Sequence, residues 1–416
     1  MKTRLVKSVK KRFYYLALIT LLGISNSILA QQNRVIDRYN GVDGYSVVFW
    51  NIENFFDLRP SPIHIETGFT PRGQMRWTRK RFNKKRDKLA KVLIATGFDG
   101  ELPVIIGLAE IENRYVLNQL IYETPLYSGN YRIVHKDSPD SRGIDVALLY
   151  RRDLFRALHT QWIPVQTNIL ESFEVEEKIQ AKESALVKTK DKINVAQFSR
   201  DILYVKGVLQ DLDTVHLFVS HWPSKFGGEK VSGPKRLAAA MALARVCDSL
   251  LQINSNANIL AMGDFNDTPN SKVFEPLKGL ILLEHNLNFT NKEDRTKNIT
   301  NYKERNAVEK SKGIDSSENS ITIELKKMGI VNLKGTIKYK GVWEKIDHFF
   351  VSGNILDVNE PIYVIRQSVA TFSAKYLLEK DKTYTGTKPY RTYIGPRYNG
   401  GLSDHLPIIL KIKREW

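Results

Sequence analysis

The chain has 416 residues, of which 42% are apolar, and this is enough for a full hydrophobic core in one large domain or two ordinary ones. Lys and Arg outnumber the acidic residues by 18, a surplus that favours contact with polyanions such as nucleic acid, phosphoinositide or anionic lipid, although solubility alone also explains it. The single cysteine, Cys247, excludes an intrachain disulfide and any zinc site built from several thiolates, so a metal must be held by oxygen and nitrogen.

Residues 1–30 predict a secretory signal peptide. Six Lys/Arg and no acidic residue precede or flank an apolar run at 13–23, which ends near the small residue Ala30. A membrane anchor is the alternative, but the uninterrupted apolar run has eleven residues, against about 20 for a bilayer span. We therefore expect cleavage near Ala30, a secreted or periplasmic protein without stable membrane insertion, and a net charge of +12 on the mature chain, since the leader carries six of the 18 surplus charges.

Short apolar runs alternate with longer helical patterns from residue 45 onward, and this alternation predicts an α/β fold, with a single domain over residues 31–416. Several runs are apolar at nearly every position, as expected of strands covered on both faces. The predicted strands are residues 45–50, 103–109, 144–150, 202–208, 215–220, 258–262, 346–351 and 406–412.

Two helices are clearly indicated. Residues 234–251 begin with a proline and then repeat Leu, Ala and Met at helical spacing, a pattern that predicts a helix starting at Pro234. Residues 78–95 form the second pattern, which stops before Gly97, a common helix terminator.

Two segments carry unusual charge. Residues 76–91 hold nine Lys/Arg and one acidic residue, so this helix either faces a polyanion or is a solvated face anchored by Phe82, Leu89 and Leu93. Residues 291–313 contain eleven charged and four apolar residues among 23, too few to bury a core, and predict a long, mobile or disordered surface insertion within the domain.

Polar side chains directly follow four of the predicted strands. Asn51, Glu110, His221 and Asp264 each come at the carboxyl end of an apolar run. In layered α/β folds this edge of the sheet is where ligands bind. Strands often end at polar residues, so one such coincidence would mean nothing, whereas four together predict a site.

The candidate site set combines oxygen ligands with histidines. Carboxylate and amide oxygens suit Mg²⁺, Mn²⁺ or Ca²⁺, and histidines exchange protons near neutral pH. Phosphodiester hydrolysis needs an activated water, a cation to neutralise developing charge, and a stabilised leaving group, and this set can supply all three. Its members are Asn51, Glu53, Glu110, His221, Asp264, Asn266, Asp347, Asp404 and His405.

Six short motifs in order resemble those of the endonuclease/exonuclease/phosphatase superfamily. That group includes pancreatic-type deoxyribonucleases, apurinic endonucleases, bacterial sphingomyelinases and inositol polyphosphate 5-phosphatases. The resemblance implies a four-layer sandwich, in which two packed mixed β-sheets are flanked by helices and the active site lies at one end of the sheet pair. The motifs read WNIEN (50–54), LAEIEN (108–113), SHWPS (220–224), GDFND (263–267), KIDHF (345–349) and SDHLP (403–407).

The resemblance also implies a metal-binding set. Glu110 matches the principal metal ligand, Asn51 and Asp404 lie near it, and Glu53 occupies the supporting acidic position of the first motif. The implied cofactor is Mg²⁺, with Mn²⁺ and Ca²⁺ as alternatives.

The remaining matched positions imply catalytic roles. Asp264 and Asn266 match the pair that orients the attacking water and the phosphate. His405 matches the histidine that contacts or protonates the phosphate, with Asp347 as its orienting carboxylate, and His221 matches the histidine on the opposite side of the phosphate. Either an Asp264-like or a His405-like group serves as the base, and the choice stays open.

Two arginines are candidates for phosphate binding. Arg142 and Arg200 lie in polar segments, and a guanidinium fork matches two phosphate oxygens. The alternative is a structural salt bridge, for which Asp145 is a possible partner of either arginine.

The substrate is the least determined feature. The 5-phosphatases carry an Asn-Arg ending and a Cys-Asp-Arg segment where this chain has Asn266-Asp267 and Ile346-Asp347. No convincing apolar hairpin of the sphingomyelinase kind is present, although residues 384–398 are aromatic enough to keep that alternative. A catalytically inactive binding module is a third alternative, yet none of the expected site residues is lost. We therefore predict a secreted, monomeric endonuclease that hydrolyses nucleic-acid phosphodiester bonds by metal-assisted attack of water.

Overall fold

The computed structural model describes residues 44–60, 68–166, 199–284 and 323–414, the last range without positions 326, 329, 331, 332 and 334. The predicted signal peptide and the predicted charged insertion at 291–313 lie outside these residues. Within the described ranges, no helix is both long and apolar enough to cross a membrane.

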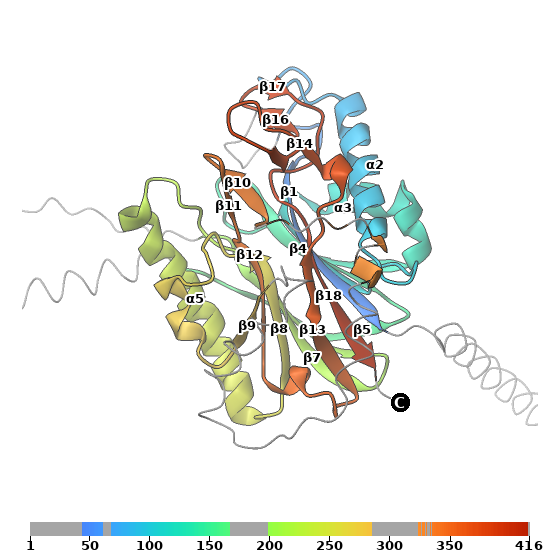
Figure 1. The fold of residues 1–416 in the computed structure, drawn as a ribbon, viewed down its shortest axis with the longest axis vertical. Helices are drawn as coiled ribbons and strands as arrows, with labels where there is room; N and C mark the ends of the chain where they lie inside the picture. The colour runs from blue at the N-terminus through green and yellow to red at the C-terminus, as the bar shows by residue number, and fades with distance from the viewer. Residues whose placement is uncertain are drawn as a thin grey trace, which may run out of the picture. The chain divides into compact units, whose positions relative to one another are not determined.

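A first six-stranded mixed sheet has the order β13-β18-β1-β2-β4-β3 (Figure 1). The β1 and β2 strands are parallel, and every other pairing in this sheet is antiparallel. Its strands are β1 (Tyr45–Phe55), β2 (Ile105–Ile111), β3 (Tyr131–His135), β4 (Asp145–Arg151), β13 (Ile362–Thr371) and β18 (Ile408–Arg414).

A second six-stranded mixed sheet has the order β5-β6-β7-β8-β12-β9. Here the parallel pair is β7 and β8, and it connects through a long helix, as a parallel crossover requires. Its strands are β5 (Phe155–Ile163), β6 (Ile202–Leu209), β7 (Asp213–His221), β8 (Asn258–Asp264), β9 (Ile281–Leu283) and β12 (Asp347–Val351).

The two sheets pack face to face, with helices on the outer faces. Helices α2 (Arg79–Ala95) and α3 (Arg114–Tyr122) bury their apolar sides against the first sheet, and α5 (Glu229–Ile253) does so against the second (Figure 1). The sheets approach so closely that a Cβ on Gly107 would lie 2.7 Å from the sulfur of Met262. These four layers confirm the predicted α/β sandwich.

Short elements complete the described chain. The strand pairs β10 with β11, β14 with β15 and β16 with β17 are antiparallel. These strands are β10 (Ile337–Tyr339), β11 (Val342–Glu344), β14 (Leu378–Lys380), β15 (Thr387–Pro389), β16 (Tyr393–Ile394) and β17 (Arg397–Tyr398). The 3₁₀ turns are η1 (Pro125–Gly129), η2 (Lys272–Leu277), η4 (Asn354–Leu356) and η5 (Lys375–Leu377).

All eight predicted strands and both predicted helices are present, but several boundaries were wrong, among them that of β2, which runs to Ile111 and therefore contains Glu110. Strand β1 runs to Phe55, so Asn51 lies within the strand and not after it. Helix α5 begins at Glu229, and Pro234 therefore lies inside the helix and not at its start. Gly228, with φ of +85°, lies directly before Glu229, so the helix begins five residues earlier than predicted.

Candidate active site

Irregular backbone at the edge of the first sheet places its acidic residues. The pairing of β1 with β2 shifts register between Asn51 and Phe55, and that of β2 with β4 shifts between Ala109 and Ile111. Glu53 and Glu110 fall in these shifts and adopt left-handed φ values of 51° and 63°. Bulges of this kind redirect side chains, and left-handed non-glycine residues concentrate at functional sites.

Asn51 connects the two sheets at this edge. Its Nδ2 donates a 3.0 Å hydrogen bond to Asp264 Oδ2 on β8 and lies 3.5 Å from Glu110 Oε1 on β2. Its Oδ1 accepts a 3.0 Å hydrogen bond from the backbone N–H of Glu53. The predicted metal-binding residue Glu110 and the predicted catalytic residue Asp264 are therefore brought to the same place.

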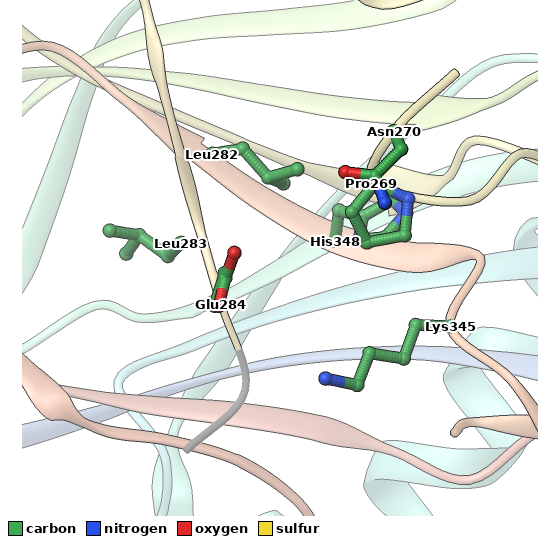
Figure 2. Close-up of a pocket in the computed structure, with 7 residues that line it drawn as sticks. All are labelled: Pro269, Asn270, Leu282, Leu283, Glu284, Lys345 and His348. Atoms are coloured by element: carbon green, nitrogen blue, oxygen red, sulfur yellow. The ribbon is translucent and has the colours of Figure 1, made fainter. Parts of the chain in front are cut away.

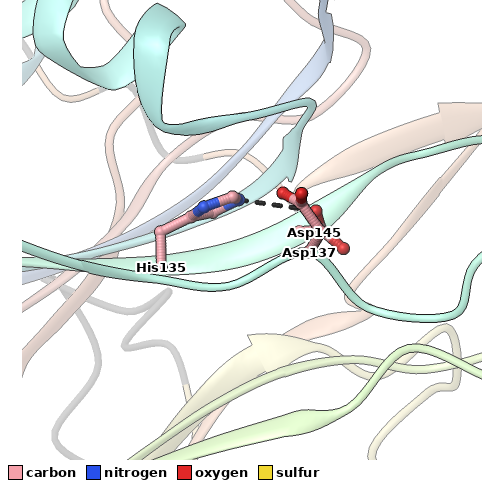
Figure 3. Close-up of side chains that lie close together, drawn as sticks. All are labelled: His135, Asp137 and Asp145. Atoms are coloured by element: carbon pink, nitrogen blue, oxygen red, sulfur yellow. Dashed lines mark ion pairs between the residues drawn. The ribbon is translucent and has the colours of Figure 1, made fainter. Parts of the chain in front are cut away.

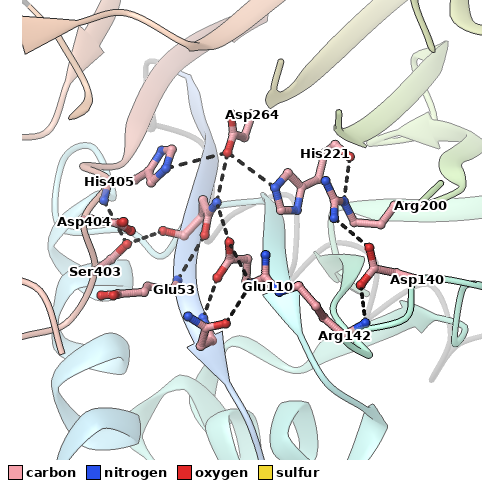
Figure 4. Close-up of polar contacts among 12 residues, drawn as sticks. Glu53, Glu110, Asp140, Arg142, Arg200, His221, Asp264, Ser403, Asp404 and His405 are labelled. Atoms are coloured by element: carbon pink, nitrogen blue, oxygen red, sulfur yellow. Dashed lines mark hydrogen bonds and ion pairs between the residues drawn. The ribbon is translucent and has the colours of Figure 1, made fainter. Parts of the chain in front are cut away.

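Two histidines approach the same carboxylate oxygen (Figure 4). His221 Nε2 lies 3.6 Å and His405 Nε2 lies 3.7 Å from Asp264 Oδ2. His405 Nδ1 is hydrogen-bonded to Asp347 Oδ2 at 2.8 Å, as the resemblance implied. Residues separated by 184 positions in the sequence thus meet at a single buried group, the Asp264 carboxylate.

The segment that carries His405 is anchored to β1. Ser403 Oγ donates to the backbone carbonyl of Asn51 at 2.6 Å and accepts from the His405 N–H at 3.0 Å. Trp50 Nε1 donates to the His405 carbonyl at 2.9 Å. These three hydrogen bonds keep the imidazole of His405 in register with Asn51.

The pKa values of the two histidines are shifted in opposite directions. Burial, with the nearby Arg200, Arg142 and His405, holds the pKa of His221 well below its usual range. Burial alone would also lower the pKa of His405, but the carboxylates of Asp347 and Asp264 raise it well above its usual value. Burial raises the pKa of Asp264 to about 7. The site therefore combines an imidazole whose pKa is lowered with one whose pKa is raised, an arrangement typical of acid–base chemistry.

Glu53 is held by an arginine that the sequence motifs did not reveal. Arg391 donates to Glu53 Oε1 from Nε at 3.0 Å and from a terminal nitrogen at 2.7 Å, and it lies 3.0 Å from Asp404 Oδ2. The N–H of Thr392 donates to Glu53 Oε2 at 3.1 Å. Both Glu53 oxygens are thus engaged, consistent with a supporting position, and Arg391 bridges two of the four predicted metal-binding residues.

Lys85 of α2 forms hydrogen bonds with both Glu53 and Thr392. It is fully buried, and its Nζ hydrogen-bonds the carbonyl of Glu53 and, at 2.8 Å, the hydroxyl of Thr392. Burial lowers the pKa of Lys85 to about 8. Its spacing from Phe82 and Leu89 places it on the apolar face of α2, a signal that was available in the sequence.

The two candidate phosphate-binding arginines differ in environment. Arg200 is buried and donates to the His221 carbonyl at 2.9 Å, the Trp222 carbonyl at 2.9 Å and Asp140 at 2.8 Å, so its guanidinium is occupied by the protein itself. Arg142 is 47% exposed and lies 3.9 Å from Glu110 Oε1, where it can contact a substrate. The structure favours the structural alternative for Arg200 only.

Two further contacts differ from the expected ones. The Asp145 carboxylate pairs with Ser138 and His135 and not with either arginine. Asn266, with a left-handed φ of 52°, donates its side-chain amide to the Trp222 carbonyl at 2.9 Å and its N–H to Asp264 Oδ1 at 3.0 Å. Asn266 therefore lies in the site and fixes the orientation of Asp264.

The donor set fits a metal ion. Asp264, Asp347 and His405 each offer a ligand atom, and these atoms lie within 4.8 Å of one another, so this buried group could hold a metal. Asp347 Oδ1 is buried and has no hydrogen-bond partner among the described residues. A buried unpaired carboxylate oxygen is costly, and a nearby cation would satisfy it.

A separate small pocket lies beside β9 (Figure 2). Within its lining, His348 is buried and Glu284 is exposed. Of the predicted site residues, none lines it. Its lining residues are Pro269, Asn270, Leu282, Leu283, Glu284, Lys345 and His348.

The comparisons identify the class of protein that this fold and site define, which is a phosphoester hydrolase. A sequence model described as the Endonuclease/Exonuclease/phosphatase family matches residues 46–303 and 290–414. The chain belongs to this family. No curated protein matches the chain.

Several solved structures are similar in fold. One is a mannosyl-6-phosphatase of Bacteroides thetaiotaomicron, with 15% identity and a TM-score of 0.47 over 88% of this chain and 99% of that one. A second, described as an endonuclease/exonuclease/phosphatase family protein of the same organism, has 15% identity and a TM-score of 0.47 over 89% and 98%. The catalytic domain of human Nocturnin has 14% identity and a TM-score of 0.44 over 90% and 95%.

Proposed function

We propose that this family member is a secreted, divalent-metal-dependent nuclease that hydrolyses phosphodiester bonds of nucleic acids. The observation that carries the proposal is the convergence of Asn51, His221 and His405 on the Asp264 carboxylate, with Glu110 beside Asn51. Acid–base groups and oxygen ligands thus lie within reach of one phosphate.

Each residue has a role that its contacts support. Glu110, Asn51 and Asp404 would hold the metal, which supplies neutralisation of negative charge on the phosphate, and in this assignment the Asp264, Asp347 and His405 group carries protons and holds no ion. Asp347 holds Nδ1 of His405, leaving Nε2 as the atom that donates to a phosphate oxygen. Asp264 is the group to which both histidines and Asn51 point, and we assign it as acceptor of the proton from the attacking water. Asn266 and Asn51 fix its two oxygens.

The charge distribution supports a nucleic-acid substrate. Residues 31–416 carry a net charge of +12, and α2 contributes several of the positive residues. Not all of them are available, because Lys85 is buried and Lys88 donates to the Gly400 carbonyl at 2.8 Å. Arg79, Lys80 and Lys84 are exposed and can contact a phosphate backbone.

A substrate panel tests the proposal. Purified protein is incubated with plasmid DNA, RNA, sphingomyelin and inositol polyphosphates, each with Mg²⁺ and with excess chelator. We expect hydrolysis of nucleic acid with Mg²⁺ and none with chelator. Preferential hydrolysis of sphingomyelin or of an inositol phosphate would contradict the nuclease assignment while leaving the phosphoesterase chemistry in place.

Charge reversal tests the electrostatic part. The triple change of Arg79, Lys80 and Lys84 to Glu should weaken DNA binding and flatten its log–log salt dependence, by roughly 0.9 in slope for each lost phosphate contact. Hydrolysis of a small phosphodiester should stay nearly unchanged. The matched control reverses Arg245, Lys272 and Lys278, which are exposed on the outer side of the second sheet. Equal weakening by both triples would show that α2 is only a solvated face.

A further inference from the structure

A second group of metal-binding side chains lies outside the candidate active site. His135 ends β3, Asp145 begins β4, and Asp137 lies in the loop between these strands (Figure 3). One ligand atom from each of the three residues falls within 4.8 Å of the others. Figure 3 shows the imidazole of His135 directed at the two carboxylates.

Two atoms of this group are buried without a hydrogen bond. His135 Nε2 and Asp145 Oδ2 face each other at 3.4 Å, and each side chain is 2% exposed. Among the described residues, neither atom has a hydrogen-bond partner. Unsatisfied buried polar atoms are costly, so a pair aimed at one point indicates a missing partner.

The neighbouring contacts leave these atoms free for a ligand. Ser138 donates to Asp145 Oδ1 from its N–H at 2.8 Å and from its hydroxyl at 2.5 Å, so the carboxylate is fixed through one oxygen and presents the other to His135. Metal-binding carboxylates are usually held by outer hydrogen bonds in this way.

The surroundings attract a cation. Glu112 interacts electrostatically with the carboxylates of Asp57, Asp137 and Asp145, so four acidic side chains lie near one another here. Lys136, in the same loop, pairs with Asp201 at 3.7 Å.

The separation of the two free atoms matches a metal. Two ligands about 2.0–2.1 Å from a tetrahedral Zn²⁺ lie about 3.3–3.4 Å apart. We propose that His135, Asp145 and Asp137 form a second metal site that binds Zn²⁺. An imidazole nitrogen with two carboxylates suits Zn²⁺ better than Mg²⁺ or Ca²⁺, which prefer oxygen alone. Asp137 is exposed, which leaves the fourth position open to water.

The ion would join the two ends of a loop that reaches the active site. Residues 136–144 connect β3 to β4, and this loop carries Asp140, which binds Arg200, and Arg142, which lies beside Glu110. An ion held by both strands would limit the freedom of the loop. The proposed ion therefore has a structural role, and it limits the movement of the loop that carries Arg142.

Zinc binding to the full chain tests the proposal. Isothermal titration calorimetry in excess Mg²⁺ measures how many Zn²⁺ ions bind to each chain. His135→Ala and Asp145→Asn should each bind one Zn²⁺ equivalent fewer than the parent protein. Ser138→Ala, which removes only an outer hydrogen bond, should weaken this equivalent roughly 10–100-fold. His159→Ala, an exposed histidine on β5, is the matched control and should change nothing.

The active site must be separated from this one. Glu110→Gln and His405→Ala should retain the equivalent that His135→Ala removes, whatever their effect on hydrolysis. If the parent and both His135→Ala and Asp145→Asn, shown to be folded by circular dichroism, bind the same number of ions, then His135 and Asp145 form a plain ion pair and the proposal is wrong. A double variant His135→Ala/His405→Ala that binds as many Zn²⁺ ions as His405→Ala alone would also overturn it.

Discussion

The edges of the two sheets contribute to the site in different ways. The first sheet presents Asn51 and the acidic residues Glu53 and Glu110 from bulged, left-handed backbone. The second presents His221 and Asp264 at the ends of strands whose pairing is regular, with the two residues directly opposite each other.

The partners of the two edges differ as well. Glu53 on the first sheet is balanced by Arg391, which is partly exposed. On the second, Asp264 and Asp347 are buried and interact with histidines. The comparison teaches that irregular backbone places the oxygen ligands of the first sheet, whereas regular strand ends hold the buried proton-exchanging groups of the second.

The largest effect should come from the second edge. Asp264→Asn removes the carboxylate that both histidines approach, and kcat should fall by roughly 10²–10⁴, the usual worth of a positioned acid or base. Steady-state kinetics on plasmid DNA measures this. Asp213→Asn, at the opposite end of the same sheet, is the control. A loss below tenfold for Asp264→Asn would remove it from the mechanism.

Arg200 and Arg142 should differ in what they do, because we assign Arg200 a structural role and Arg142 a contact with the substrate. Arg200→Met should destabilise the fold by about 3 kcal/mol, because it leaves the Asp140 carboxylate unpaired in a largely buried setting. Arg142→Ala should change stability by less than about 0.5 kcal/mol and lower kcat/KM instead. Denaturant unfolding and kinetics separate the two. Equal stability of both variants would contradict the structural role of Arg200.

A change at the first edge should act on the metal. Glu110→Gln keeps the shape of the side chain and removes its charge, so the Mg²⁺ concentration for half-maximal activity should rise at least 10-fold. Circular dichroism should show an unchanged fold. An unaltered metal requirement would show that Glu110 is not a ligand and that the division between the edges is wrong.

The buried second edge should also be sensitive to acid. Burial lowers the pKa of His348 to about 4, so the folded state binds its proton more weakly than the unfolded state does. The free energy of unfolding that depends on neutral His348 is fully present above the unfolded pKa near 6.5. It is lost as the pH falls toward 4, and the loss is about 2 kcal/mol at pH 5. His348→Phe, within an aromatic cluster, should flatten this dependence in urea unfolding at pH 5 and 7.5. If the pH dependence of the free energy of unfolding were the same in His348→Phe, His348 would not be the cause of this acid sensitivity.

The sequence predicted the core of this arrangement because the information is local. Buried strands are continuous apolar runs, and the first four motifs lie at the carboxyl ends of such strands, whereas KIDHF (345–349) and SDHLP (403–407) lie at or before the start of one. Strand β5 was missed because it is exposed at several positions, and β13 because Arg366 and Gln367 interrupt its apolar pattern at a register shift.

Long-range partners could not be predicted in the same way. Arg391 lies 338 residues from Glu53 and in no recognised motif, so only the fold brings them together. Arg200 resembles a substrate ligand in sequence, yet the turn after β7 supplies two carbonyls that occupy it. Lys85 is the exception, since its helical spacing already placed it on the buried face.

The most direct test of the account is the position of a metal and a phosphate in the crystalline protein. Crystals grown with Mn²⁺ and inorganic phosphate should show an anomalous manganese peak bonded to Glu110. A phosphate oxygen should lie within hydrogen-bonding distance of Nε2 of both His221 and His405. A phosphate bound away from either histidine, or a manganese peak that does not contact Glu110, would contradict the claim that the two edges act on one phosphate.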